Sequence, residues 1–202
     1  MLTRETIESC EKENLPTLAF TLEKADIEAL VGWLIEKDDN FRYKCFLLLQ
    51  CRSEQQPDVY PFWDVFVEKL KSDNSYQRSL GLMLIAENAR WDQAGKFETV
   101  IETYLSLCDD EKPVTVRQCI QGLGKIVPCK PPCHARIIEK LTAIDLMQRK
   151  ETQRKLLLLD ILSTLILIQK HQPDPQIERY LHNALTGGIL DLKAKKQIMD
   201  ML

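Results

Sequence analysis

Two cysteines and a histidine lie close together in the segment PCKPPCHAR, residues 128–136. Thiolate and imidazole groups bind zinc, and a structural zinc site takes four such ligands, commonly beginning with a Cys-x2-4-Cys pair. Cys129 and Cys133 fit the first half of that pattern, with His134 beside them. No second Cys or His pair follows, and two adjacent prolines predict a break between helices. We therefore expect a connector without a metal, and a site at Cys129, Cys133 and His134 is the alternative.

A second candidate lies in the segment ENARWDQ, which contains Glu87, Asn88, Arg90, Trp91 and Asp92. Exposed together, these side chains would form a recognition patch, because tryptophan and arginine are common at the centres of protein interfaces. The alternative is a tryptophan that packs over a helix junction while its charged neighbours stay in solvent. We favour packing and keep the patch as a hypothesis.

Sequence signatures of enzymes are absent. There is no Gly-rich phosphate loop, no Gly-x-Ser-x-Gly and no His-Glu-x-x-His. His171 and His182 stand apart from any candidate nucleophile. Whether the protein is an enzyme stays open, but we name no catalytic residue, expect no cofactor and favour a non-enzymatic protein.

Charge divides the chain into two halves. Residues 1–110 contain 12 Lys and Arg against 21 Asp and Glu, whereas residues 111–202 contain 15 against 9. We expect one acidic and one mildly basic end. The cysteines are odd in number and scattered, and the first residues are charged, which predicts a cytoplasmic protein with free thiols.

The longest apolar run, residues 156–168, carries Asp160 in its middle. A membrane span needs about 20 apolar residues. The run therefore predicts a buried helix, and we expect no membrane partner.

Helical periodicity runs through most of the chain, and the alternation typical of strands is absent. Segments 26–35, 59–70, 96–105 and 176–185 each place apolar residues on one face. Each is followed by a helix that is apolar over more of its surface. The expected fold class is all-α.

Basic residues recur at one place in these second helices. Arg42, Arg78, Arg117 and Arg154 are separated by 36, 39 and 37 residues, and Lys196 marks a weaker fifth copy. A period of about 35 to 45 residues with two helices is typical of a helical solenoid. Acids in the preceding turns are expected to bond these arginines, which gives them a structural role.

The segment KPVTVRQCIQGLGKI, residues 112–126, resembles the second helix of a HEAT repeat, in which a proline and a Val-Arg pair precede small and aliphatic residues. The resemblance extends as a period over residues 25–202. It implies an α-α superhelix of about five stacked HEAT-like helical hairpins. The expected parts of this one continuous domain are an N-terminal helical cap at 1–24 and hairpins at 25–56, 57–92, 93–130, 131–172 and 173–202.

HEAT and armadillo arrays are commonly platforms for partners, so the resemblance implies a scaffold that binds a protein or peptide through its concave face and loops. The expected contact residues are polar residues of second helices that core packing does not require. Besides the Trp91 segment, these are Gln77, Gln118, Gln121, Lys125 and Gln153.

The Trp91–Asp92 pair also resembles the Trp-Asp stretch of the AlkD-type DNA glycosylases, which are HEAT-like solenoids. In that family an aspartate one helical turn beyond the tryptophan supports base excision. Gly95 occupies that position here, so the catalytic carboxylate is missing. The acidic N-terminal half also disfavours phosphate contacts. Nucleic-acid binding through the basic C-terminal half is the alternative function.

Overall fold

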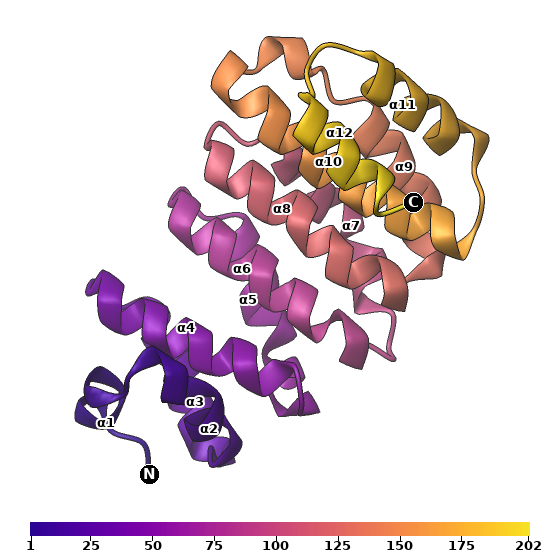
Figure 1. The fold of residues 1–202 in the computed structure, drawn as a ribbon. Coiled ribbons are helices and arrows are strands. Elements are labelled where there is room, and N and C mark those ends of the chain that lie inside the picture. The colour runs from indigo at the N-terminus through magenta and orange to yellow at the C-terminus, as the bar shows by residue number, and fades with distance from the viewer. The chain divides into compact units, whose positions relative to one another are not determined.

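The computed structural model describes all 202 residues, and all of its regular elements are helices (Figure 1). The predicted all-α class is confirmed. Contacts divide the chain into two compact units, Met1–Ala94 and Gly95–Leu202. None of the helices combines the length and the apolar character needed to cross a membrane.

The N-terminal unit contains six α-helices and three short 3₁₀ segments. The α-helices are α1 (Arg4–Ser9), α2 (Leu15–Phe20), α3 (Lys24–Trp33), α4 (Asp39–Ser53), α5 (Trp63–Leu70) and α6 (Ser75–Asn88). The 3₁₀ segments are Lys12–Asn14, Pro57–Phe62 and Ala89–Trp91.

The C-terminal unit also contains six α-helices. They are α7 (Lys96–Ser106), α8 (Pro113–Ile126), α9 (His134–Thr142), α10 (Glu151–His171), α11 (Pro175–Thr186) and α12 (Leu192–Met199). Its 3₁₀ segments are Leu107–Asp109, Val127–Cys129, Pro131–Cys133 and Leu146–Gln148.

Two α-helices fall within each of the five ranges expected to be hairpins, and α1 and α2 fall within the expected cap. Short polar residues define several starts. The Asp38 carboxylate accepts hydrogen bonds from the backbone N–H groups of Asn40 and Phe41, both at 3.0 Å, and so caps α4. Asn74 caps α6 in the same way through the N–H of Tyr76. The division into repeats stays a prediction.

The helix expected over residues 59–70 is shorter than predicted. A 3₁₀ segment occupies Pro57–Phe62, and α5 begins only at Trp63. Pro61 lies inside the 3₁₀ segment and has no N–H to donate, which disfavours a continuous α-helix through this point. The expectation of one helix over this range was therefore wrong at its start.

One helix in each unit, α4 in the N-terminal unit and α10 in the C-terminal unit, lies in the core. Helix α4 packs against α1, α2, α3 and α6, and α10 packs against α8, α9, α11 and α12. Contacts on several sides require apolar residues around most of the helix, which explains the long apolar run 156–168 within α10. Ile161, Leu162 and Leu165 of this run are fully buried, whereas Leu156 faces solvent.

Three of the four periodic arginines hold the turn before their own helix. Arg42 donates to the Glu36 carbonyl at 2.5 Å and to the Asp39 carboxylate. Arg78 donates to the carbonyls of Ser72 at 2.8 Å and Asp73 at 3.0 Å.

Arg154 and Arg117 depart from the expected acid pairing. Arg154 donates to the carbonyls of Met147 at 3.0 Å and Arg149 at 2.9 Å, and not to the carboxylate of an acid in the preceding turn. Turn carbonyls without a helical partner need donors, and a guanidinium can supply them. Arg117 instead reaches Asp160 on α10. A structural role in the preceding turn is seen for Arg42, Arg78 and Arg154, and Arg42 also bonds the side chain of an acid in that turn, Asp39.

Candidate functional site

The segment PCKPPCHAR forms a packed connector between α8 and α9. Cys133 and His134 are buried, and the His134 ring nitrogen Nε2 lies 2.9 Å from the Val127 carbonyl. The buried Lys130 ammonium pairs with Glu98 of α7 at 3.5 Å. Cys129 is exposed. No group of three or more His, Cys, Asp or Glu side chains in the structure could hold a metal ion.

Glu87 and Asn88 do not form the surface patch considered above. Both side chains are buried where α6 meets α4. Gln50 of α4 donates to Glu87 Oε1 at 2.7 Å, and the Asn88 amide donates to the hydroxyl of Ser53 at 3.0 Å. A partner could not reach either group without opening the helix pair, so both belong to the core.

The rest of the Trp91 segment is mostly used for packing as well. The half-buried Trp91 indole donates to the Ser53 carbonyl at 2.6 Å, and the buried Asp92 carboxylate accepts from the Tyr60 hydroxyl at 2.6 Å. Of the five residues named as candidates, only Arg90 is exposed. The packing alternative explains this segment, because the Trp91 indole and the Asp92 carboxylate both form hydrogen bonds inside the unit.

Gly95, at the position of the glycosylase aspartate, has a φ of 71° and precedes α7. This is the left-handed region that glycine adopts without strain. A side chain here would be strained by the backbone conformation, so the local structure disfavours an aspartate at this position.

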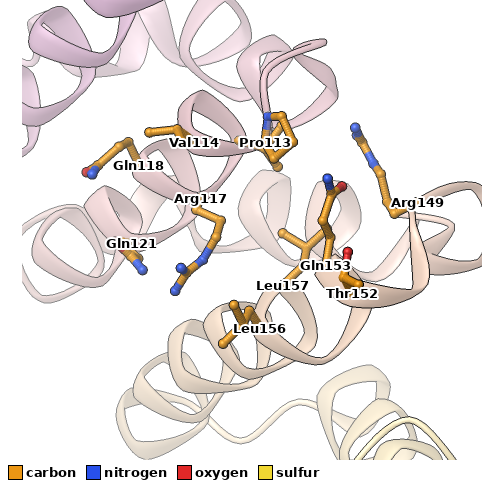
Figure 2. A pocket seen from close by; sticks show the side chains of 11 residues that line it. Pro113, Val114, Arg117, Gln118, Gln121, Arg149, Thr152, Gln153, Leu156 and Leu157 are labelled. Atoms are coloured by element: carbon orange, nitrogen blue, oxygen red, sulfur yellow. The ribbon is translucent and has the colours of Figure 1, made fainter.

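A groove between α8 and α10 brings together three of the predicted contact residues. Figure 2 shows the side chains that line it, projecting from α8, from α10 and from the loop before α10. They are Pro113, Val114, Val116, Arg117, Gln118, Gln121, Arg149, Thr152, Gln153, Leu156 and Leu157. Gln118, Gln121 and Gln153 were expected as contacts, and they now share one site.

The surface of the groove combines exposed apolar side chains with free amides. Val114 is 66% exposed and Leu156 is 46% exposed. The carboxamides of Gln118 and Gln153 have no hydrogen-bond partner within the chain. Each therefore offers donors and an acceptor to a ligand.

Of the two arginines that line the groove, Arg117 is paired with a carboxylate. Arg117 donates to both carboxylate oxygens of Asp160, at 2.6 and 3.2 Å, and Gln121 donates to the same carboxylate at 3.0 Å. Hydrogen bonding to Asp160 raises the pKa of the Arg117 guanidinium. At the other end, Arg149 donates to the carbonyls of Cys108 at 3.1 Å and Asp110 at 3.4 Å. The two arginines thus fix the helices around the groove.

The groove is lined by neutral side chains and two arginines. It has no acid, histidine, cysteine or lysine among its lining residues, and so no general acid–base group. Its volume is about 220 Å³. Pockets for small-molecule ligands and cofactors span roughly 300–1,000 Å³, so this groove suits a side chain or two of a larger partner.

The remaining predicted contacts lie elsewhere. Lys125 is exposed on α8 but does not line the groove. Gln77 lines a separate cavity in the N-terminal unit. Sequence reasoning missed Val114 and Leu156, because an apolar residue at a helix start or in the run LLLL carries no sign that it faces solvent.

Comparison with known proteins identifies no relative. No protein-family model matches the chain, and no curated protein matches it at a significant level.

Proposed function

We propose that the protein is a non-enzymatic scaffold of the HEAT-repeat type, an α-α superhelix of about five hairpins, that binds a segment of another protein. The two α-helices in each expected range support this proposal. So do the periodic arginines, three of which hold the turn that begins a second helix. Similar turns at a roughly fixed period are what a stacked array of hairpins needs. The odd and scattered cysteines support a cytoplasmic location.

The groove between α8 and α10 carries the binding part of the proposal. Exposed Val114 and Leu156 offer an apolar contact, while the carboxamides of Gln118 and Gln153 lack partners. A peptide backbone presents N–H and C=O groups in alternation, and a glutamine can bond both. The proposed occupant is an extended segment with an apolar side chain seated between Val114 and Leu156.

Nucleic acid is the less favoured partner. Five basic residues of the C-terminal unit are engaged with carboxylates within the same unit. Such pairs are formed by Arg117, Lys130, Arg136, Lys140 and Lys155. Phosphate contacts would have to compete with these pairs, which supports a protein partner.

A displayed library of random peptides tests the proposal. Selection on the intact protein should enrich peptides with a shared apolar anchor. Val114→Glu should weaken their binding at least tenfold, because a charge would replace the apolar contact. Leu192→Glu is the matched control, since Leu192 is also exposed in the C-terminal unit but lies outside the groove; it should change binding less than twofold.

Either of two results would contradict the groove assignment: no enrichment, or enriched peptides that bind Val114→Glu as well as wild type. Binding of duplex DNA in low salt that falls steeply as salt is added would favour the nucleic-acid alternative instead.

A further inference from the structure

A second cavity, in the N-terminal unit, is lined by positively charged side chains. It lies where the turns before α4 and α6 meet α5, and its volume is about 480 Å³. We call it the lysine cavity. Its lining residues are Ile35, Lys37, Arg42, Val65, Glu68, Lys69, Ser72, Asn74 and Gln77.

Lys69 of α5 is the central cation of this cavity. It is only 8% exposed, and its ammonium donates to Gln77 Oε1 at 2.5 Å. The Gln77 amide in turn donates to the Leu34 carbonyl at 2.8 Å, which holds its oxygen toward the lysine. Lys69 forms no ion pair with a carboxylate. An ammonium has three N–H groups, so two remain for a ligand.

Arg42 adds a second cation beside Lys69. It is 7% exposed, and its guanidinium lies 4.1 Å from the centre of the Tyr76 ring. Its Nη atoms bond Glu36 and Asp39, but its buried Nε–H has no partner. Burial lowers the pKa of Lys69, and the charge of Arg42 lowers it further. Two cations held so close together and away from water favour an anion between them.

We propose that the lysine cavity binds a phosphate monoester. Three cations and one carboxylate line it, and with the paired neighbours Asp39 and Lys71 included the formal charge of the group is +2. A phosphate monoester carries about −1.5 to −2 at neutral pH, which matches this charge. The carboxylate, Glu68, is already engaged by Lys71 at 2.7 Å.

Neutral donors and apolar residues complete the site. Ser72 and Asn74 supply a hydroxyl and an amide, and the N-terminus of the 14-residue helix α6 adds its positive dipole end. Ile35 and Val65 are exposed beside these polar groups. They provide contact for the carbon skeleton that carries the phosphate. The proposal is separate from the groove in the C-terminal unit and does not depend on it.

The proposal can be tested on the full-length chain. All three tryptophans, Trp33, Trp63 and Trp91, lie in the N-terminal unit, so their fluorescence reports the unfolding of that unit. Titration with phenyl phosphate, at constant ionic strength against chloride, should raise its Tm. The expected rise is about 3–5 °C at ten times Kd. Acetate and inorganic phosphate at equal concentration should shift the Tm less.

Substitutions locate the binding. Lys69→Met should weaken phenyl phosphate binding at least tenfold, as measured by calorimetry. The ligand-free variant should melt at a higher temperature than wild type. Methionine has a shape similar to that of lysine but places no charge in the buried position. Lys24→Met is the control, since Lys24 is exposed in the same unit and lies outside the cavity. Ser72→Ala provides a milder second variant, with an expected loss of about threefold to tenfold.

The outcomes separate the possibilities. No Tm rise with phenyl phosphate, equal binding by Lys69→Met, or equal binding of acetate would each overturn the proposal. A short phosphoserine peptide and its unphosphorylated form identify the source of the phosphate. Tighter binding of the phosphopeptide than of phenyl phosphate supports a phosphorylated protein side chain, and the reverse ranking supports a small phosphorylated molecule.

Discussion

Arg42 and Arg117 stand at equivalent positions of the period, yet they do different things. Arg42 is buried against its own turn and against Tyr76 beside the lysine cavity, and its only carboxylate partner, Asp39, is exposed to solvent. Arg117 spans to Asp160 on the next core helix and so loses its net charge. The N-terminal unit thereby gains a cationic cavity, and the C-terminal unit gains a groove of amides and apolar side chains.

One residue on the following second helix accounts for the difference. Asp160 lies six residues after Arg154, the next periodic arginine beyond Arg117. Six residues after Arg78, the next one beyond Arg42, is the fully buried Leu84. A leucine cannot accept a hydrogen bond, so Arg42 turns back to its own turn. Helices with a similar sequence pattern can thus present different chemistry when one residue on the following second helix differs.

The largest expected effect concerns helix spacing in the two units. A Cβ on Gly81 of α6 would lie 2.7 Å from the Phe66 carbonyl of α5, whereas a Cβ on Gly124 of α8 would meet only Leu167 at 3.7 Å. Gly81→Ala should destabilise the protein by about 3 kcal/mol, because backbone must move. Gly124→Ala should be neutral or stabilising by up to about 1 kcal/mol through helix propensity.

Urea unfolding should be followed by tryptophan fluorescence for Gly81→Ala and by circular dichroism for Gly124→Ala. Equal changes in the free energy of unfolding for the two variants would show that α5 and α6 are not packed more closely than α8 and α10.

The acidic partners of the two arginines should differ in importance. The Asp160 side chain is 12% exposed, whereas the Asp39 side chain is 81% exposed. Asp160→Asn should lower the free energy of unfolding by about 2 kcal/mol, because it removes a shielded carboxylate that accepts hydrogen bonds from both Arg117 and Gln121. Asp39→Asn should lower it by less than about 0.5 kcal/mol, as is usual for exposed pairs. Urea unfolding followed by circular dichroism measures both free energies. A larger loss for Asp39→Asn than for Asp160→Asn would contradict the difference between Arg42 and Arg117.

The smallest effect concerns the connector that leaves α6. Trp91→Phe keeps the aromatic ring but removes the bond to the Ser53 carbonyl, so it should cost about 1 kcal/mol. Its exposed neighbour provides the control, and Arg90→Ala should stay within about 0.5 kcal/mol of wild type. Thermal melts compare the two. If neither variant moves the Tm, Trp91 would return as a candidate for partner contact.

The fold class was accessible from sequence because helical periodicity is local. Apolar residues three and four positions apart select the helices, and the proline pair in PCKPPCHAR marks a break regardless of what packs nearby. The start of α5 was missed because Pro61 competes with the periodicity of residues 59–70. Periodicity reports which face is apolar, but proline decides which hydrogen bonds exist.

The candidate sites were accessible only in part. Gln118, Gln121 and Gln153 were named one by one as polar residues of second helices, but no spacing in the sequence indicates that they share a groove. Lys69 carries no signal at all, since an amphipathic helix ordinarily keeps its lysines in solvent. Its burial depends on α5 meeting the turn before α6.

Helix content, the break at the prolines and the period of the arginines follow from the order of residues along the chain, because each depends on neighbours a few positions away. The pairing of Arg117 with Asp160, the burial of Glu87 and Asn88, and the two cavities depend on side chains 30 to 45 residues apart. Such contacts arise only when helices pack, and one facing residue, Asp160 or Leu84, is enough to change them.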